Sequence, residues 1–123
     1  MELIQFAKLH HIKACCVISC VGSVHPLHIR LANQKKGISK KGYFEILSLS
    51  GTLSSSSAHL HLAVADKVGK VIGGHLMEGT CVYTTAEVVL GILPNLSFDR
   101  QPDAITGYKE LVVRPAVRQQ KKS

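Results

Sequence analysis

The chain has 123 residues, 46% hydrophobic and 19% charged, which is enough apolar material for one core and too little length for two domains. No apolar run approaches the roughly 20 residues of a membrane-spanning helix, and Met1–Phe6 lacks the layout of a secretory signal, so we exclude both classes and expect an intracellular protein, nuclear or cytoplasmic. Fifteen Lys and Arg against eight Asp and Glu give a formal charge of +7, which permits contact with nucleic acid without demonstrating it.

The first half of the chain contains one helical pattern followed by strand patterns. Apolar residues at helical spacing predict an amphipathic helix over Glu2–His11. The β-branched apolar run Ala14–Val21 predicts a buried strand, and His28–Leu31 a second strand. Asn33–Gly42 is polar and basic and contains glycine, which predicts a surface loop. Tyr43–Leu49 is predicted as a strand that Gly51 closes.

A β-hairpin is the clearest pattern that follows. After the serine loop Ser54–Ser57, the segment Ala58–Ala65 alternates apolar and polar residues almost strictly, as a half-buried strand does. Asp66–Lys70 supplies a turn with glycine at position 69, and Val71-Ile72 returns as the partner strand. The pair Gly73-Gly74 then predicts either a bulge or a close approach of two backbones.

The last part of the chain adds the longest apolar run. Thr80–Leu93 is β-branched and ends at a proline, so we predict the central strand of the sheet there. Asn95–Tyr108 is predicted as loop and Lys109–Val113 as a last strand. The whole predicts an α+β fold, a mostly antiparallel β-sheet packed with one or two helices, in a single domain over residues 1–113. Residues 114–123 are predicted to be a basic, disordered tail.

The cysteines and most of the basic residues have ordinary structural explanations. Cys15, Cys16, Cys20 and Cys81 form no CxxC pair, and three of them lie in one apolar run, so neither a disulfide framework nor a cysteine zinc site is predicted. Solvated charge is the usual explanation for a basic loop. The loop lysines remain a candidate nucleic-acid site: Lys35, Lys36, Lys40 and Lys41.

Three histidines form a candidate metal site. Alternate side chains of a strand point to the same face, so His59 and His61 project together, with Cα atoms roughly 6.5 Å apart. The predicted turn brings the returning strand alongside, and His75 follows the two glycines that leave room for its approach. Three imidazoles with an open fourth position form an arrangement that Zn²⁺ adopts. Alternation alone also yields exposed histidines on a polar hairpin face, so both explanations stay open.

An enzyme at the same histidines would need a carboxylate to act as general base. Glu78 and Glu87 are the nearby candidates along the chain, and Glu87 lies within an apolar strand, where a carboxylate must be paired or lie at an interface. Salt bridges or interface contacts explain both glutamates as well. The sequence has no GxSxG elbow, Walker phosphate loop or GxGxxG fingerprint. A zinc-dependent hydrolase or lyase therefore stays an alternative.

Four segments in series carry a resemblance to a known family: GYFEILSLSG (Gly42–Gly51), HLHLAVAD (His59–Asp66), GKVIGGHLMEG (Gly69–Gly79) and VYTTAEVVLG (Val82–Gly91). Together they resemble the plant-and-prokaryote-conserved (PPC) domain, from about Leu3 to Tyr108. The resemblance implies an antiparallel sheet packed on a helix, assembly as a homotrimer, and a non-enzymatic role in partner binding, with DNA association or transcription regulation.

The resemblance also implies roles for residues. The metal positions of similar members match His59, His61 and His75, and Gly42–Ser48 matches the segment associated with subunit contact. With Glu87, the implied interface candidates are Gly42, Tyr43, Phe44, Glu45 and Leu47.

Two features depart from the family pattern. The Arg-Gly-Arg core of the AT-hook, which enters the minor groove in plant members, is absent. We therefore expect no direct reading of DNA sequence by this chain. The family's leading strand, which precedes the first helix, also has no counterpart, so we expect an exposed sheet edge in an N-terminally truncated domain.

Overall fold

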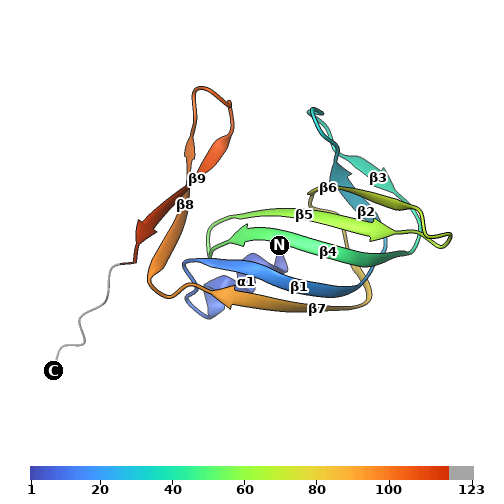
Figure 1. Cartoon of the computed structure of the whole chain (residues 1–123), viewed down its shortest axis with the longest axis horizontal. Coiled ribbons are helices and arrows are strands. Elements are labelled where there is room, and N and C mark those ends of the chain that lie inside the picture. The colour runs from blue at the N-terminus through green and yellow to red at the C-terminus, as the bar shows by residue number, and fades with distance from the viewer. Residues whose placement is uncertain (117–123) are drawn as a thin grey trace. The chain divides into compact units, whose positions relative to one another are not determined.

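The computed structural model describes residues 1–116 and shows one helix and nine strands among them (Figure 1). The elements are α1 (Glu2–Leu9), β1 (Cys15–Val24), β2 (Leu27–Arg30), β3 (Ile38–Lys40), β4 (Phe44–Leu53), β5 (Ala58–Ala65), β6 (Val71–Leu76), β7 (Val82–Ile92), β8 (Leu96–Pro102) and β9 (Lys109–Pro115). The α+β class with a mostly antiparallel sheet is confirmed, with one short helix.

The chain forms two compact units that alternate along the sequence. The first contains Met1–Cys15, Leu53–Ala58 and the described residues from Ile92 onward, and the second contains Cys16–Thr52 and His59–Gly91. The first unit includes α1 and the two-stranded sheet of β8 and β9, and the second contains most of a seven-stranded sheet. Because the chain passes between the units more than once, they are not consecutive sequence domains.

The seven strands follow the order β3-β2-β6-β5-β4-β1-β7. Figure 1 shows β5, β4, β1 and β7 side by side and running in alternating directions. The strand β5 buries Leu60, Leu62 and Val64 on one face and leaves His59 and His61 exposed on the other. The same alternation in β2 buries Leu27 and Ile29. The apolar face of these strands forms the core of the sheet, and the opposite face is free to carry polar side chains.

The helix is shorter than its pattern. It ends at Leu9, two residues before the predicted end, because His11 adopts a left-handed φ of 54°. The backbone N–H of Ile12 then donates to the carbonyl of Ala7, which is the buried residue of the helix. Within residues 1–116 there is no helix long and apolar enough to cross a membrane.

The predicted β5–β6 hairpin is confirmed at its turn. The Asp66 carboxylate accepts hydrogen bonds from the backbone N–H groups of Val68 and Lys70, at 3.0 and 2.9 Å. Gly69 has a φ of 82°, which glycine adopts without steric cost. The turn therefore fixes the register of the two strands, with Ala65 opposite Val71.

The two glycines of β6 mark a close approach of backbones and not a bulge. Ala63 pairs with Gly73 and Leu62 with Gly74 in an uninterrupted register. A Cβ atom on Gly74 would lie 2.6 Å from the carbonyl oxygen of Arg30 in β2, and one on Gly73 would lie 2.9 Å from that of Leu62. Glycine thus lets β6 pack tightly between both neighbours.

Five other sequence predictions are corrected. The strand predicted to be central, β7, lies at one edge of the described sheet and exposes many of its apolar side chains, because a local apolar pattern does not specify the order of the strands. The strand β3 forms within the predicted basic loop, β4 continues through Gly51 to Leu53, and β8 forms where a loop was predicted. The strand β9 includes Arg114 and Pro115 of the predicted tail. Residues 117–123 lie outside the described part of the chain.

The tight packing of β6 can be tested with a Gly74→Ala variant. We expect a loss of about 1–3 kcal/mol in the free energy of unfolding, because the added methyl group overlaps the Arg30 carbonyl. Urea denaturation at fixed protein concentration measures the change. The control is Gly69→Asn, which should lie within about 0.5 kcal/mol of the wild type, since open space surrounds Gly69 and Asn tolerates positive φ. Equal stability of Gly74→Ala and wild type would contradict the proposed packing.

Candidate metal centre

His59, His61 and His75 converge on one face of the hairpin. Their ring centroids are 5.1 Å apart for His59 and His61, 5.2 Å for His59 and His75, and 5.8 Å for His61 and His75. One nitrogen of each ring lies within 4.8 Å of the other two. Tetrahedral Zn²⁺ with Zn–N bonds of about 2.1 Å separates its ligand atoms by about 3.4 Å. Small side-chain rotations therefore suffice for all three rings to reach one ion.

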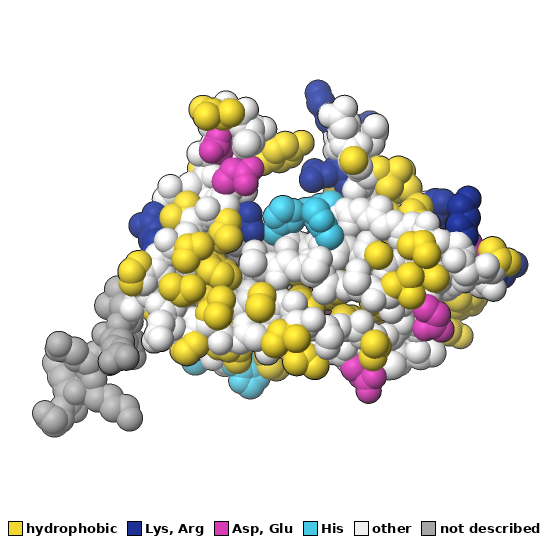
Figure 2. All heavy atoms as spheres, in the orientation of Figure 1, with side chains coloured by type: hydrophobic (Ala, Val, Ile, Leu, Met, Phe, Trp, Pro, Cys, Tyr) yellow, Lys and Arg dark blue, Asp and Glu magenta, His cyan; other side chains and the backbone are white. Residues whose placement is uncertain are grey.

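The register of the hairpin produces this convergence. His75 lies directly opposite His61, and residues that pair across an antiparallel ladder point to the same face. Two residues nearer the turn, the same face carries only Ala63 and its partner Gly73. In Figure 2 a group of histidine side chains is visible at the surface, over the region of β5 and β6 in Figure 1. The ligand atoms thus meet over small residues on an accessible face.

The environment of His75 suits a metal ligand. Its Nδ1 atom is buried and has no hydrogen-bond partner among the described residues, and a bond to a metal ion satisfies a nitrogen of this kind. Burial lowers the pKa of His75, and the nearby charge of Arg30 and the two other histidines lower it further. A lowered pKa favours the neutral imidazole, which is the form that binds metal.

The two glutamates considered as catalytic bases are not placed alike. Three strand spacings separate β7, which carries Glu87, from β5 in the sheet order, a distance of about 14 Å within one protomer. Glu78 follows β6 and is exposed, and its backbone carbonyl accepts a hydrogen bond from His28 Nδ1. Glu87 is therefore too far from the three histidines to act as a base in its own protomer.

The residues predicted for subunit contact differ in exposure. Phe44 is buried in the core of its own protomer, with 6% exposure, whereas Tyr43, Leu47 and Glu87 are exposed. Glu45 is exposed as well, and Gly42 is half-buried. The alternation of β4 explains the difference, because it directs Phe44 to the opposite face from its two neighbours.

Two further histidines have structural partners that the sequence did not indicate. His25 Nδ1 donates a 2.6 Å hydrogen bond to the Gly42 carbonyl, and its ring stacks on Tyr43 with centroids 4.4 Å apart. Tyr43 in turn contacts Tyr83 of β7, at a centroid distance of 4.6 Å. His28 is held beside the start of the β6–β7 connection by its bond to Glu78. Neither ring joins the metal cluster.

The lysines of the candidate nucleic-acid site lie around β3. Lys35 and Lys36 precede this strand, Lys40 ends it, and Lys41 follows, and all four are exposed. In the described sheet β3 is the edge opposite to β7. Of the cysteines, Cys15 and Cys20 are buried, Cys16 is half-buried and Cys81 is exposed, and burial raises the pKa of the Cys20 thiol.

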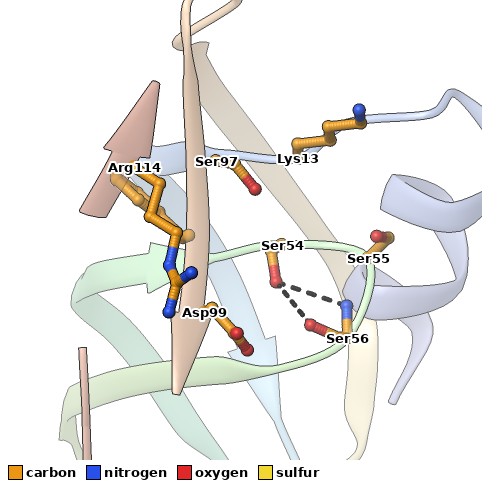
Figure 3. A pocket seen from close by; sticks show the side chains of 8 residues that line it. Lys13, Ser54, Ser55, Ser56, Ser97, Asp99 and Arg114 are labelled. Carbon is orange, nitrogen blue, oxygen red and sulfur yellow. Dashed lines mark hydrogen bonds between the residues drawn. The ribbon is translucent and has the colours of Figure 1, made fainter. Parts of the chain in front are cut away.

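The serine run forms part of a polar pocket of about 330 Å³ in the first unit (Figure 3). The hydroxyl of Ser54 accepts hydrogen bonds from the backbone N–H groups of Ser56 and Ser57, and it also bonds the Ser56 hydroxyl. Figure 3 shows the two bonds between Ser54 and Ser56, with Asp99 and Arg114 among the other residues that line the pocket. The serines thus satisfy one another in a short ordered loop, as the sequence predicts.

Comparison with known proteins gives relatives along most of the chain. It is 46% identical over 114 residues to the bifunctional protein GlmU of a Synechococcus strain, which covers 93% of this chain and 18% of that protein. The chain therefore spans about a fifth of the length of this curated relative.

Two solved structures are similar along nearly all of the chain. A hypothetical protein from Salmonella enterica is 43% identical with a TM-score of 0.91, covering 94% of this chain and 84% of the other. A protein from Archaeoglobus fulgidus described as metal-containing is 28% identical with a TM-score of 0.75, covering 90% and 82%. The model of the Plants and Prokaryotes Conserved (PCC) domain matches residues 1–94. The chain belongs to this family, which is the one that its four sequence segments resemble.

Proposed function

We propose that this chain is a non-enzymatic binding and assembly domain that holds a divalent metal ion, Zn²⁺ foremost, on His59, His61 and His75. The observation that carries the proposal is the convergence of three imidazole nitrogens within 4.8 Å on one accessible sheet face. The orphaned Nδ1 of His75 supports it. The description of the Archaeoglobus fulgidus relative as metal-containing supports it as well.

Three imidazole nitrogens favour Zn²⁺ over Ca²⁺ or Mg²⁺, because Ca²⁺ and Mg²⁺ bind oxygen ligands. Such a site leaves a fourth position open for a ligand from solution or from a partner. A hydrolase would also need a carboxylate near that position; Glu87 is about three strands away in the same protomer, and Glu78 is an exposed residue beyond the end of β6. The geometry therefore supports binding better than hydrolysis.

Metal binding can be tested by calorimetric titration of the chelator-treated protein with Zn²⁺. We expect one ion per protomer for the wild type, and a loss of at least 10-fold in affinity for His61→Ala, because a three-ligand site becomes a two-ligand site. His10→Ala is the matched control, since His10 is exposed and its one ring contact among those described is with Phe6 of α1. An unchanged affinity in His61→Ala would refute the proposed site.

Assembly is the second part of the proposal. The edge strand β7 exposes Val82, Tyr83 and Val89, each more than half accessible, and β1 and β4 expose Ile18 and Leu47 to a similar extent. Adjacent strands with this much exposed apolar surface mark an interaction surface. An edge strand also presents unpaired backbone groups to another chain. We propose that three copies associate through this edge, as the family resemblance implies.

The assembly can be tested by light scattering at micromolar protein concentration. The wild type should have three times the 13.3 kDa protomer mass, and Val89→Lys should lower the mass toward that of the protomer, because it places a charge in the apolar contact. Val68→Lys is the control, since Val68 is 78% exposed in the β5–β6 turn. A well-behaved wild-type monomer would exclude the trimer.

Nucleic-acid contact stays a weaker prediction. The four lysines around β3 lie at the other edge of the sheet from β7, so an assembly through β7 would leave them available. A trimer would also multiply the formal charge of +7 carried by each chain.

A further inference from the structure

Arg30 lies beside the three histidines, although it is far from them in the sequence. The strand β2 pairs with β6, and Arg30 is the direct partner of His75. Paired residues of an antiparallel ladder have Cα atoms about 4.5–5.5 Å apart and share a face. Because Leu27 and Ile29 are buried on the other face of β2, the Arg30 side chain belongs to the face that carries the histidines.

The backbone around Arg30 holds this arrangement in place. Gly74 allows β6 to approach the Arg30 carbonyl, where a Cβ atom would be 2.6 Å from the oxygen. Arg30 is half-buried, and its pairing with His75 places the two side chains next to each other on one face of the sheet.

The charges on this face favour an anion. Three neutral imidazoles with a divalent ion carry a charge of +2, to which Arg30 adds another positive charge. Within the described strands β2, β5 and β6, this face carries no Asp or Glu. The residues on it are His28, Arg30, His59, His61, Ala63, Ala65, Val71, Gly73 and His75. A ligand from solution that brings negative charge would compensate the cations.

The same face has room for such a ligand. Ala63 and Gly73, which pair with each other, lie next to the pair formed by His61 and His75. Neither has a side chain larger than a methyl group, and Gly73 is exposed. A small molecule can therefore approach the open metal position without displacing a bulky residue.

We propose that this site binds a small free carboxylate, with one oxygen on the metal ion and the other hydrogen-bonded to Arg30. The inference rests on the proposed metal site and adds the chemical class of its ligand. A carboxylate fits because its two oxygens can serve two cations at once, and the guanidinium is the side chain best shaped to pair with it. An oxygen ligand completes a tetrahedral site with three imidazoles.

The test uses the full chain loaded with Co²⁺, whose visible absorption reports a change of metal ligand. Acetate is the carboxylate probe and azide the comparison, because azide can bind the metal through a single nitrogen. We expect acetate to bind the wild type and its affinity to fall at least 10-fold in Arg30→Gln, the effect of losing one charge-assisted hydrogen bond. In Arg30→Lys, which keeps the charge but loses the planar fork, acetate binding should weaken more than azide binding.

Several results separate the two proposals. A wild-type protein that does not bind Co²⁺ would refute the metal site and the ligand inference together. A wild type that binds Co²⁺ but not acetate would overturn only the ligand inference. An Arg30→Gln variant that binds acetate and azide with the same affinities as the wild type would do the same. Tighter, Arg30-dependent binding of phosphate than of acetate would overturn the carboxylate class. Lys70→Gln, at the exposed β5–β6 turn, should bind acetate as the wild type does.

Discussion

The antiparallel pairing of β6 with its two neighbours is the constraint on which the site depends. His61 and Arg30 lie on different strands, and both are direct partners of His75. A shift of one residue in either register would turn a whole strand over and separate these side chains. The Asp66 turn fixes one register, and the glycine pair allows the close packing of the other. The geometry of the site is thus set by backbone interactions more than by contacts among its side chains.

The sequence contained enough information to predict the hairpin and its histidines. Alternation in Ala58–Ala65 determines which face each residue occupies, and a turn with an Asp at its start and Gly69 near its end leaves little freedom in the pairing. The convergence of His59, His61 and His75 follows from these local features. The role of Arg30 could not be predicted in the same way, because it requires the pairing of β2 with β6, which are separated by some forty residues of chain.

Other errors have a common cause, which is that local patterns do not specify strand order. The apolar run in β7 has the composition of a buried central strand, yet it lies at the edge of the described sheet with apolar side chains exposed. An apolar composition predicts that the surface of a strand is covered, but it does not predict whether the same chain or another copy covers it. The opposite error concerns β3 and β8, where polar residues and glycine concealed strands that pair with β2 and β9.

The positions of the sites in the sheet allow assembly and ligand binding to coexist. The histidines lie on β5 and β6, three strand spacings or more from the β7 edge, while the exposed lysines surround β3 at the other edge. An association that covers β7 would not need to cover the histidine face of β6. Assembly would then stabilise the strand with the most exposed apolar surface, while the metal and its anion remain in exchange with solution. The open fourth position would also distinguish the proposed site from a purely structural zinc site, which is closed by a fourth protein ligand.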